Sequence, residues 1–381
     1  MKAMRPKLQP SVYSESQLRR FLNCIAFPGF TDAQEAATAP LPKPTLRTLS
    51  LLQAHCVTTF PFESLAINYE PGGQMDLSPA YVFERFVEQG CGGYCFQANF
   101  LYQQMLRAVG YRTFAVLGRV FGPENQQYSG LTHMANLVYL PSHLAEDNAK
   151  SVYYLADIGY GSNVQRPMLL RHGHVEPGRG GDLFRLLHEP LQPRSCFEEV
   201  DEEEDDNNDQ AAASGQDQVA QQMPGNQAVW KLQSKTASRD TWQECYSLTT
   251  LEVFEPDCAA SNKAVSSKTA RPFASTIMIV KFFWDRERLA QSDELVARDG
   301  LHPDLFPYHP SCIEQKMIVG DNKLITKTST DQIVVHTLQT EEERIQTIKR
   351  VFGLLPNTSL QQALDEIKGK PSALKPPSQT A

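Results

Sequence analysis

Long apolar runs are missing from this chain. No stretch of about 18 apolar residues occurs and no hydrophobic segment opens the N-terminus, so we expect neither a membrane-spanning helix nor a secretory signal. The eight cysteines are scattered rather than gathered into a disulfide framework, which favours a reducing cytoplasm as the compartment. No basic face or stripe is visible, so nucleic acid and membrane are not expected partners.

A recognisable metal-binding cysteine pattern is also missing. Cys91 and Cys95 are one residue farther apart than the common C-x-x-C pair, and no second pair follows them. Together with His133 these cysteines could suggest zinc, but the spacing argues against it. We therefore expect no metal.

Charge is distributed unevenly along the chain. The net charge is −8, and ten acidic residues lie between Glu198 and Asp217, so the rest of the chain is close to neutral. Residues 198–226 contain no large aromatic side chain, and such a stretch cannot bury enough apolar surface to offset its ordering entropy. We predict a disordered acidic insertion over 198–226, with a binding role as the alternative.

Apolar spacing divides the chain into a helical first part and a strand-rich remainder. Helical periodicity predicts helices over 15–24, 45–56, 79–89 and 95–109, and the proline-rich residues 28–44 are predicted to form a surface connection. From residue 112 the period changes, which predicts strands over 113–121, 132–140, 152–158, 228–232, 244–254, 275–283, 314–319, 323–327 and 332–338. A last helix is predicted over 341–352.

Cys95 is placed where a loop with two glycines becomes a helix. The helical apolar spacing starts at Cys95 and stops at Gly110, so the cysteine lies in the first turn. There the unpaired amide groups and the positive end of the helix dipole favour the thiolate, which is the nucleophilic form. The structural alternative is a small buried hydrophobic residue, as for any single cysteine.

One histidine and one aspartate are predicted at strand ends downstream of this cysteine. His133 lies at the start of an alternating strand, and Asp157 follows an apolar strand and precedes two glycines. Nucleophilic catalysis uses this set of groups, because the cysteine attacks, the histidine takes its proton and the aspartate fixes the imidazole tautomer. From the residues alone, a triad and separate structural roles both remain open.

Three segments together resemble the arylamine N-acetyltransferases. They are Gly-Gly-Tyr-Cys-Phe-Gln-Ala-Asn at 92–99, His-Met-Ala-Asn-Leu-Val at 133–138 and Asp-Ile-Gly-Tyr-Gly at 157–161, in the order and at the approximate spacing of that family. Pro-Phe-Glu-Ser-Leu at 61–65 resembles a further family motif. The resemblance covers roughly residues 10–355.

The resemblance implies a site, a donor and an acceptor. It implies a catalytic triad of Cys95, His133 and Asp157. It also implies acetyl-CoA or a related acyl-CoA as donor and an aromatic amine or hydrazine as acceptor. Substrate contacts are expected from Phe62, Tyr94 and Tyr160, and cations for coenzyme A could come from Lys231, Lys263, Lys268, Arg271 and Lys281.

The expected fold class is α+β with a cysteine-protease-like Cys-His-Asp core. It comprises an N-terminal helical bundle, a β-barrel-like middle domain and a C-terminal α/β lid. The predicted boundaries are 1–112 for the helical domain with the nucleophile, 113–270 for the barrel with the histidine and aspartate, 271–368 for the lid and 369–381 for a flexible tail.

One departure from the family pattern concerns a buried ion pair. The family usually has an arginine directly before the two glycines, which pairs with the glutamate of Pro-Phe-Glu, and this chain has Cys91 there while keeping Glu63. A buried unpaired carboxylate is costly, so we expect Glu63 to find Arg85 or Arg119 instead, or to be solvated. A second departure is Tyr160, where phenylalanine is usual, and its hydroxyl could change acceptor choice.

The predicted reaction is a two-step acyl exchange through a cysteine thioester. The acyl group, whether acetyl, propionyl or malonyl, and the natural amine stay open at this point, as does the oligomeric state. A thiol hydrolase or transglutaminase-type enzyme is the nearest alternative, because it uses similar groups. A non-catalytic binding descendant of the family is the second alternative, prompted by the lost arginine.

Overall fold

The first part of the chain is helical, as predicted. The computed structural model describes residues 5–73, 75–141, 152–161, 164–191, 228–267, 272–320, 322–330 and 332–374. The helices here are α1 (Glu15–Cys24), α2 (Ala33–Thr38), α3 (Leu46–Thr59), α4 (Leu65–Tyr69), α5 (Pro79–Phe83) with a π-helical turn over Glu84–Glu88, and α6 (Cys95–Val109). The predicted bounds of α1 and α6 are confirmed, because Ser14 caps the first helix and Gly110 ends the second in the left-handed conformation.

The helix α2 corrects the prediction that residues 28–44 are only a connection. Asp32 Oδ1 accepts hydrogen bonds from the amides of Gln34 at 2.8 Å and Glu35 at 3.1 Å. This cap satisfies two amides that have no partner within a helix, so it starts a short helix despite the nearby prolines.

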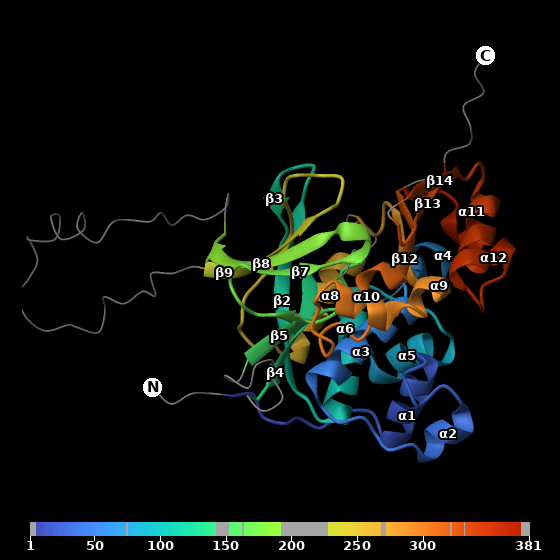
Figure 1. Cartoon of the computed structure of the whole chain (residues 1–381). Coiled ribbons are helices and arrows are strands. Elements are labelled where there is room, and N and C mark those ends of the chain that lie inside the picture. Colours follow the sequence, from blue (N-terminus) through green and yellow to red (C-terminus); the bar gives the residue numbers. More distant parts are fainter. Residues whose placement is uncertain are drawn as a thin grey trace, which may run out of the picture.

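The middle of the chain forms a strongly curved antiparallel sheet (Figure 1). Among the described residues it has nine strands in the order β6-β5-β4-β2-β10-β9-β8-β7, with β3 paired to β2. The strands are β2 (Arg112–Gly122), β3 (Gln127–Tyr128), β4 (His133–Leu140), β5 (Val152–Ala156), β6 (Met168–Leu169), β7 (His174–Pro177), β8 (Leu183–Pro190), β9 (Ala228–Lys235) and β10 (Gln243–Leu248). Because β4 pairs with both β2 and β5, the predicted catalytic histidine and aspartate come from neighbouring strands.

The C-terminal part forms a second antiparallel sheet in the order β1-β11-β12-β13-β14. Its members are β1 (Phe62–Glu63), β11 (Ile277–Trp284), β12 (Ile313–Gly320), β13 (Lys323–Lys327) and β14 (Ile333–Thr337), with helices α9 (Arg286–Leu289), α10 (Ser292–Arg298), α11 (Glu341–Thr347) and α12 (Leu360–Ile367). A π-helical turn over Ile348–Phe352 continues α11. The helix and this turn together cover the predicted last helix. The N-terminal part supplies β1, where Phe62 pairs with Val280 and Glu63 with Ile279.

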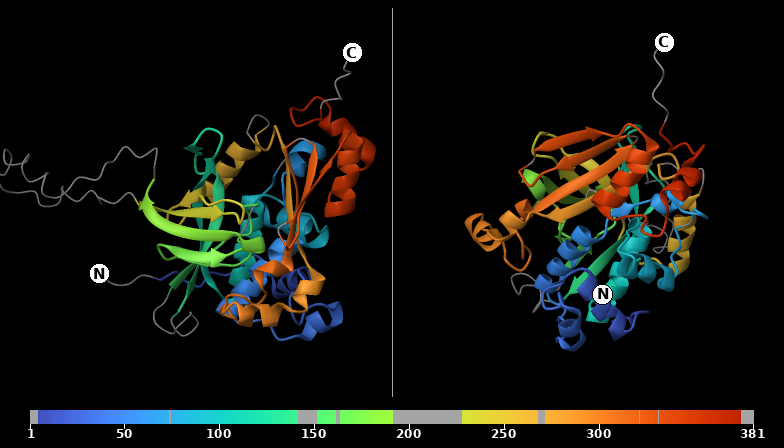
Figure 2. Two further views of the ribbon diagram at one scale, coloured as in Figure 1. Left: turned by 45° about the horizontal axis from the view of Figure 1, so that its top comes forward. Right: turned by 90° about the vertical axis from the view of Figure 1, so that its right-hand side faces the viewer.

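The N-terminal helices lie between the two sheets (Figure 2). α6 packs against β2 and β4, while α3 packs against β11. The largest apolar cluster accordingly joins α1, α3 and α6 to Phe282 of β11. This arrangement is the predicted α+β fold class with a barrel-like sheet. The predicted domain boundaries stay predictions.

Several predicted elements differ from the observed ones. The predicted strand 244–254 ends at Leu248, and an unpredicted helix, α8 (Glu255–Ser266), follows it. The strands β7 and β8 were not predicted. The α8 helix gives a weak sequence signal because Cys258 and Val265 are its only buried side chains among the described residues.

The predicted tail is anchored over its first residues. Lys370 Nζ donates to the carbonyls of Ile67 at 3.1 Å and Asn68 at 2.8 Å, and Ser372 Oγ donates to Asn68 Oδ1 at 2.6 Å. These bonds connect the described residues 370–374 to α4, and the flexible tail over 369–381 stays a prediction. The predicted insertion 198–226 lies outside the described residues. In the part of the chain that the structure describes, no helix has the length and apolar character needed to cross a membrane.

Candidate active site

Cys95 is the first residue of α6. The loop that precedes it packs tightly against β1. Glu63 N donates to the Gly93 carbonyl at 3.0 Å, and Gly93 N donates to the Pro61 carbonyl at 3.3 Å. A Cβ atom on Gly92 would lie only 1.8 Å from the Pro61 carbonyl oxygen, so this position excludes any other residue. The motif glycine thus fixes where α6 starts and where the Cys95 thiol is held.

The structure brings the three predicted catalytic residues together. His133 Nε2 lies 2.8 Å from Asp157 Oδ2, and both side chains are buried. Cys95 lies near enough to His133 to raise the pKa of the imidazole. Because Asp157 occupies Nε2, the other ring nitrogen, Nδ1, is the one left for the thiol. Cys95 Sγ further lies 3.7 Å from the carbonyl oxygen of Thr132, the residue before the histidine.

The electrostatics of this group favour a charged histidine–aspartate pair. Burial by itself would lower the pKa of His133, but the charge of Asp157 and its hydrogen bond, helped by Cys95, raise it to about 10. Burial would raise the pKa of Asp157, yet the charge and hydrogen bond of His133 outweigh it and hold that pKa below its usual range. An imidazolium next to the thiol is therefore stable near neutral pH.

Asp157 receives hydrogen bonds from two side chains that the sequence did not single out. Tyr246 Oη donates to Oδ2 at 2.8 Å, and Asn99 Nδ2 donates to Oδ1 at 2.8 Å. The Gly159 amide donates to Oδ1 at 2.7 Å. Asn99 lies one helical turn after Cys95, and this spacing could have indicated its role. Tyr246 comes from β10 and gives no comparable signal in the sequence.

The loop after Asp157 presses directly on the start of α6. A Cβ atom on Gly159 would lie 2.5 Å from Cys95 Cα, so only glycine allows this approach. Asn99 Oδ1 accepts from the amide of Ile158 at 3.0 Å, which ties the same loop to α6. The position of the carboxylate relative to the thiol is thus set by backbone contacts as well as by the histidine.

The three predicted substrate-binding residues lie in two groups. Tyr160 packs edge-on against His133, with ring centroids 5.6 Å apart, and its hydroxyl donates to the Cys245 carbonyl at 3.2 Å. Phe62 and Tyr94 instead both pack against Phe273, at centroid distances of 6.1 and 5.2 Å. Tyr160 therefore contacts His133, whereas Phe62 and Tyr94 meet at Phe273 in the apolar cluster that also holds Cys95.

The helix α8 packs beside the thiol. Cys258 and Val265 of α8 share an apolar cluster with Cys95. Asn262 holds the helix in place, since its Nδ2 donates to the Met75 carbonyl at 2.8 Å and its side chain accepts from the Tyr94 hydroxyl. The hydroxyl of Tyr94 is thus engaged in packing between α6 and α8.

Glu63 is paired with Arg85, one of the two cations expected to replace the missing arginine. Arg85 Nη2 lies 2.6 Å from Glu63 Oε1, and both side chains are almost fully buried. Arg85 also donates from Nε to the Gly92 carbonyl at 2.8 Å and from Nη1 to Glu70 at 3.0 Å. Arg119 is not involved and donates to the Ser129 carbonyl at 3.2 Å.

Cys91, which stands where the family has its arginine, is buried in an apolar cluster with Leu65 and Tyr69. Burial raises the pKa of its thiol to about 12. Cys91 is therefore held as a neutral thiol and does not compete with Cys95 as a nucleophile.

The cations proposed for coenzyme A have varied surroundings. Lys231 is buried and paired with Glu189 and Glu244, and Lys281 Nζ donates to the Phe352 carbonyl at 3.4 Å. Lys263 is exposed on α8. Lys268 and Arg271 lie outside the described residues. No three histidine, cysteine or acidic side chains of the described stretches gather into a group able to hold a metal ion, and a metal-free site stays a prediction.

Comparison with known proteins agrees with the resemblance seen in the sequence. An N-acetyltransferase family model matches residues 45–303, which is more than half of the chain. N-malonyltransferase FDB2 of Fusarium pseudograminearum is 25% identical over 367 residues, covering 91% of this chain and 90% of its own length. Arylamine N-acetyltransferase 2 of Mus musculus is 31% identical over 147 residues, covering 38% of this chain and less than half, 47%, of its own length.

Solved structures share the fold at low sequence identity. The arylamine N-acetyltransferase of Mycobacterium abscessus has a TM-score of 0.63 at 17% identity, covering 92% of this chain and 94% of that one. The Mycobacterium marinum enzyme in complex with CoA has a TM-score of 0.60 at 19% identity, covering 92% of this chain and 98% of the other. Taken with the family match, the chain belongs to the arylamine N-acetyltransferase family of N-acyltransferases.

Proposed function

We propose that this protein transfers a short acyl group from acyl-coenzyme A, through a thioester on Cys95, to the amino group of an aromatic amine or hydrazine. The observation that carries the proposal is the buried His133–Asp157 pair, 2.8 Å between Nε2 and Oδ2, placed beside the thiol at the start of α6. A cysteine beside an imidazole that a buried carboxylate holds in place is the arrangement of an activated nucleophile.

In the first step, Cys95 Sγ attacks the thioester carbonyl carbon. The new carbon–sulfur bond forms and the bond to the coenzyme A sulfur breaks. The leaving thiolate takes the proton from His133. The oxyanion needs donors already in place, and the Cys95 amide is suited to this because amides of the first helical turn have no partner within the helix.

In the second step, the acceptor amine attacks the acyl group on Cys95. His133, now neutral, takes the proton of the amine, and Cys95 leaves as thiolate beside a recharged imidazolium. Asp157 stays ionised throughout, since its hydrogen bonds from Tyr246 and Asn99 stabilise the carboxylate. Its role is to hold the tautomer and to stabilise the charged ring.

The acyl donor is supported by relatives rather than by contacts in this chain. A structural neighbour is described in complex with CoA, and a relative of nearly equal length is an N-malonyltransferase. Malonyl-CoA is therefore a donor to be tested beside acetyl-CoA and propionyl-CoA.

The experiment is a matrix of acyl donors and acceptors, read by release of free coenzyme A. Acetyl-, propionyl- and malonyl-CoA are each combined with an arylamine, an arylhydrazine, a lysine peptide or no acceptor. We expect steady turnover only with an aromatic amine or hydrazine present. Equal turnover without acceptor would indicate a hydrolase. Turnover with the lysine peptide as the sole productive acceptor would indicate a transglutaminase-type enzyme. No turnover with any combination of donor and acceptor would indicate a binding protein.

A further inference from the structure

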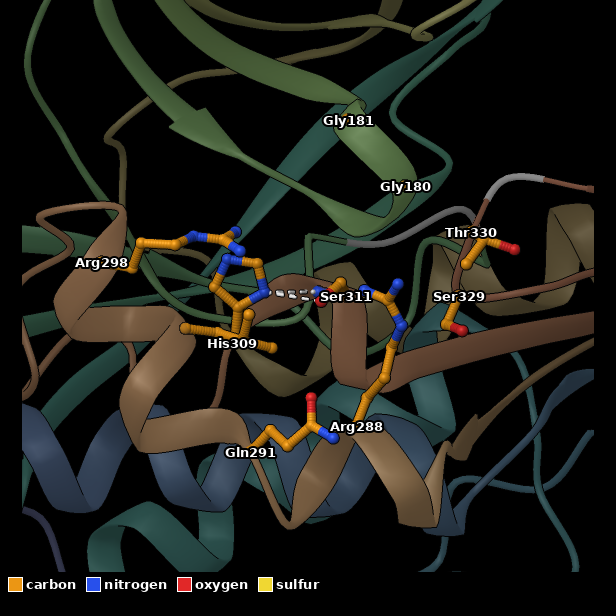
Figure 3. A pocket seen from close by; sticks show the side chains of 10 residues that line it. Gly180, Gly181, Arg288, Gln291, Arg298, His309, Ser311, Ser329 and Thr330 are labelled. Atoms are coloured by element: carbon orange, nitrogen blue, oxygen red, sulfur yellow. Dashed lines mark hydrogen bonds between the residues drawn. The ribbon is translucent and has the colours of Figure 1, made fainter.

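A separate cleft of about 530 Å³ opens between the β7–β8 turn, the segment that links β11 to β12, and Ser329 and Thr330, which follow β13 (Figure 3). None of the triad residues lines it. Its lining is polar and includes Arg288, Arg298 and His309, and among the described residues that line it none is acidic. A cleft of this size accommodates a small organic molecule rather than a lone ion.

Hydrogen bonds between the walls hold this cleft open in one shape. Arg179, which precedes the glycine turn Gly180–Gly181, donates from Nη1 to the Thr328 carbonyl at 2.9 Å. Ser329 Oγ donates to Asp285 Oδ2 at 2.6 Å, and Asp285 in turn caps α9. The three walls are thus linked to one another, so a ligand would find a site that is already formed.

Basic side chains converge on the cleft from the β11–β12 segment. Figure 3 shows Arg298, His309 and Arg288 beneath the Gly180–Gly181 turn. Arg298 and His309 share the carboxylate of Asp299, with Nε–Oδ1 at 2.7 Å and Nε2–Oδ2 at 3.0 Å.

Arg288 is the arginine of this cleft that forms no close ion pair with a described residue, although its charge is felt by Asp285, whose pKa it helps to lower. Within the described stretches, no carboxylate oxygen comes within 4 Å of its guanidinium, although it lines the cleft and is only half-buried. Its backbone amide donates a hydrogen bond to the Asp285 carboxylate. That carboxylate also accepts hydrogen bonds from the Glu287 amide and the Ser329 hydroxyl. A planar guanidinium with free donors is the group best suited to bind phosphate oxygens in two places at once.

We propose that this cleft binds a small phosphorylated molecule. Arg288 is the principal contact to the phosphate, and the hydroxyls of Ser311 and Thr330 and the side-chain-free Gly180–Gly181 turn surround it. The phosphate group could belong to the nucleotide end of coenzyme A or to a separate compound. Binding needs no turnover, so this proposal stands or falls independently of acyl transfer.

The test is calorimetric titration of the intact chain with two probes, inorganic pyrophosphate and adenosine 3′,5′-bisphosphate. We expect binding with a Kd of about 1 mM or tighter. Arg288→Gln should weaken it roughly tenfold or more, because a charged hydrogen bond is lost. Arg286→Gln is the matched control, since Arg286 is exposed on the same helix and does not line the cleft. Thr330→Glu, which adds a carboxylate at the rim, should also weaken binding.

Competition distinguishes the two sources of the phosphate. Displacement by coenzyme A, with a higher KM for acyl-CoA in Arg288→Gln at unchanged kcat, assigns the cleft to the acyl donor. Binding without competition and with unchanged KM assigns it to another phosphorylated compound, and both results support the site. Failure of both probes to bind, or equal binding by the wild type and an Arg288→Gln variant of unchanged melting temperature, would overturn the proposal.

Discussion

Two buried ion pairs lie on either side of the Cys95 loop, and they differ in what their remaining atoms contact. Around Glu63 and Arg85 the guanidinium is used up by Glu70 and the Gly92 carbonyl, so nothing is left for a reacting group. Around Asp157 and His133 the carboxylate is fully engaged, but one imidazole nitrogen remains for the thiol. The Glu63–Arg85 ion pair thus holds the loop in place, whereas the Asp157–His133 pair keeps one ring nitrogen able to exchange a proton with the thiol.

The difference between the two ion pairs predicts that the largest loss of activity follows a substitution of Asp157. Asp157→Asn should lower kcat/KM by about four orders of magnitude, as the loss of a tautomer-setting carboxylate does in other triads. With the amide oxygen kept for Asn99 and Gly159, the amide nitrogen would face His133 Nε2, which places the ring proton on the side of Cys95. Steady-state rates, taken at a temperature where circular dichroism shows a folded chain, measure this. Near-normal turnover would remove Asp157 from the site.

The second-largest effect concerns Arg85 and is on stability. Arg85→Met leaves the Glu63 carboxylate buried without a cation, and breaking such a pair costs roughly 3–5 kcal/mol. Urea denaturation measures the loss. Arg119→Met is the control, because among the described residues the Arg119 side chain bonds a single carbonyl, so its loss should change the free energy of unfolding by less than about 1 kcal/mol. Equal effects of the two substitutions would show that Arg85 does not balance Glu63.

Restoring the family's arginine sharpens the same point. Because Arg85 already holds Glu63, Cys91→Arg adds a second cation and extra volume inside an apolar cluster, and overpacking costs about 1–3 kcal/mol. The melting temperature should fall or stay unchanged. A clear rise would mean that Glu63 still lacks a full partner.

The smallest expected effect separates the two tyrosines beside His133. Tyr246→Phe removes one donor from the Asp157 carboxylate and should lower kcat about tenfold, in line with a hydrogen bond to a charged group. Tyr160→Phe is the comparison variant, because its hydroxyl bonds the Cys245 carbonyl and not Asp157, so we expect it to change the preference among acceptors more than kcat with one acceptor. If the two variants lose activity equally, the hydrogen bond to Asp157 is not what matters.

Local signals in the sequence predicted the elements that carry the candidate triad. The Gly110 cap fixed the end of α6, and the alternation after His133 indicated β4, so Cys95, His133 and Asp157 were placed on the right elements. The family resemblance, not the spacing, supplied the donor and acceptor.

Features that depend on distant contacts were beyond the sequence. Tyr246 reaches Asp157 across 89 residues, and nothing in its own segment distinguishes it from a core tyrosine. Arg85 and Arg119 were equally suitable partners for Glu63 until the fold placed one of them beside it. The helix α8 buries too little apolar surface to produce a clear period.

Residence of the acyl group on Cys95 is tested most directly by mass spectrometry of the chain after brief exposure to acyl-CoA without an acceptor. We predict one acyl group per chain, located on the peptide that contains Cys95, present in Cys91→Ser and absent from Cys95→Ser, and lost when an arylamine is added. Acylation that persists in Cys95→Ser, or that lies on Cys91, would contradict the assignment of the nucleophile.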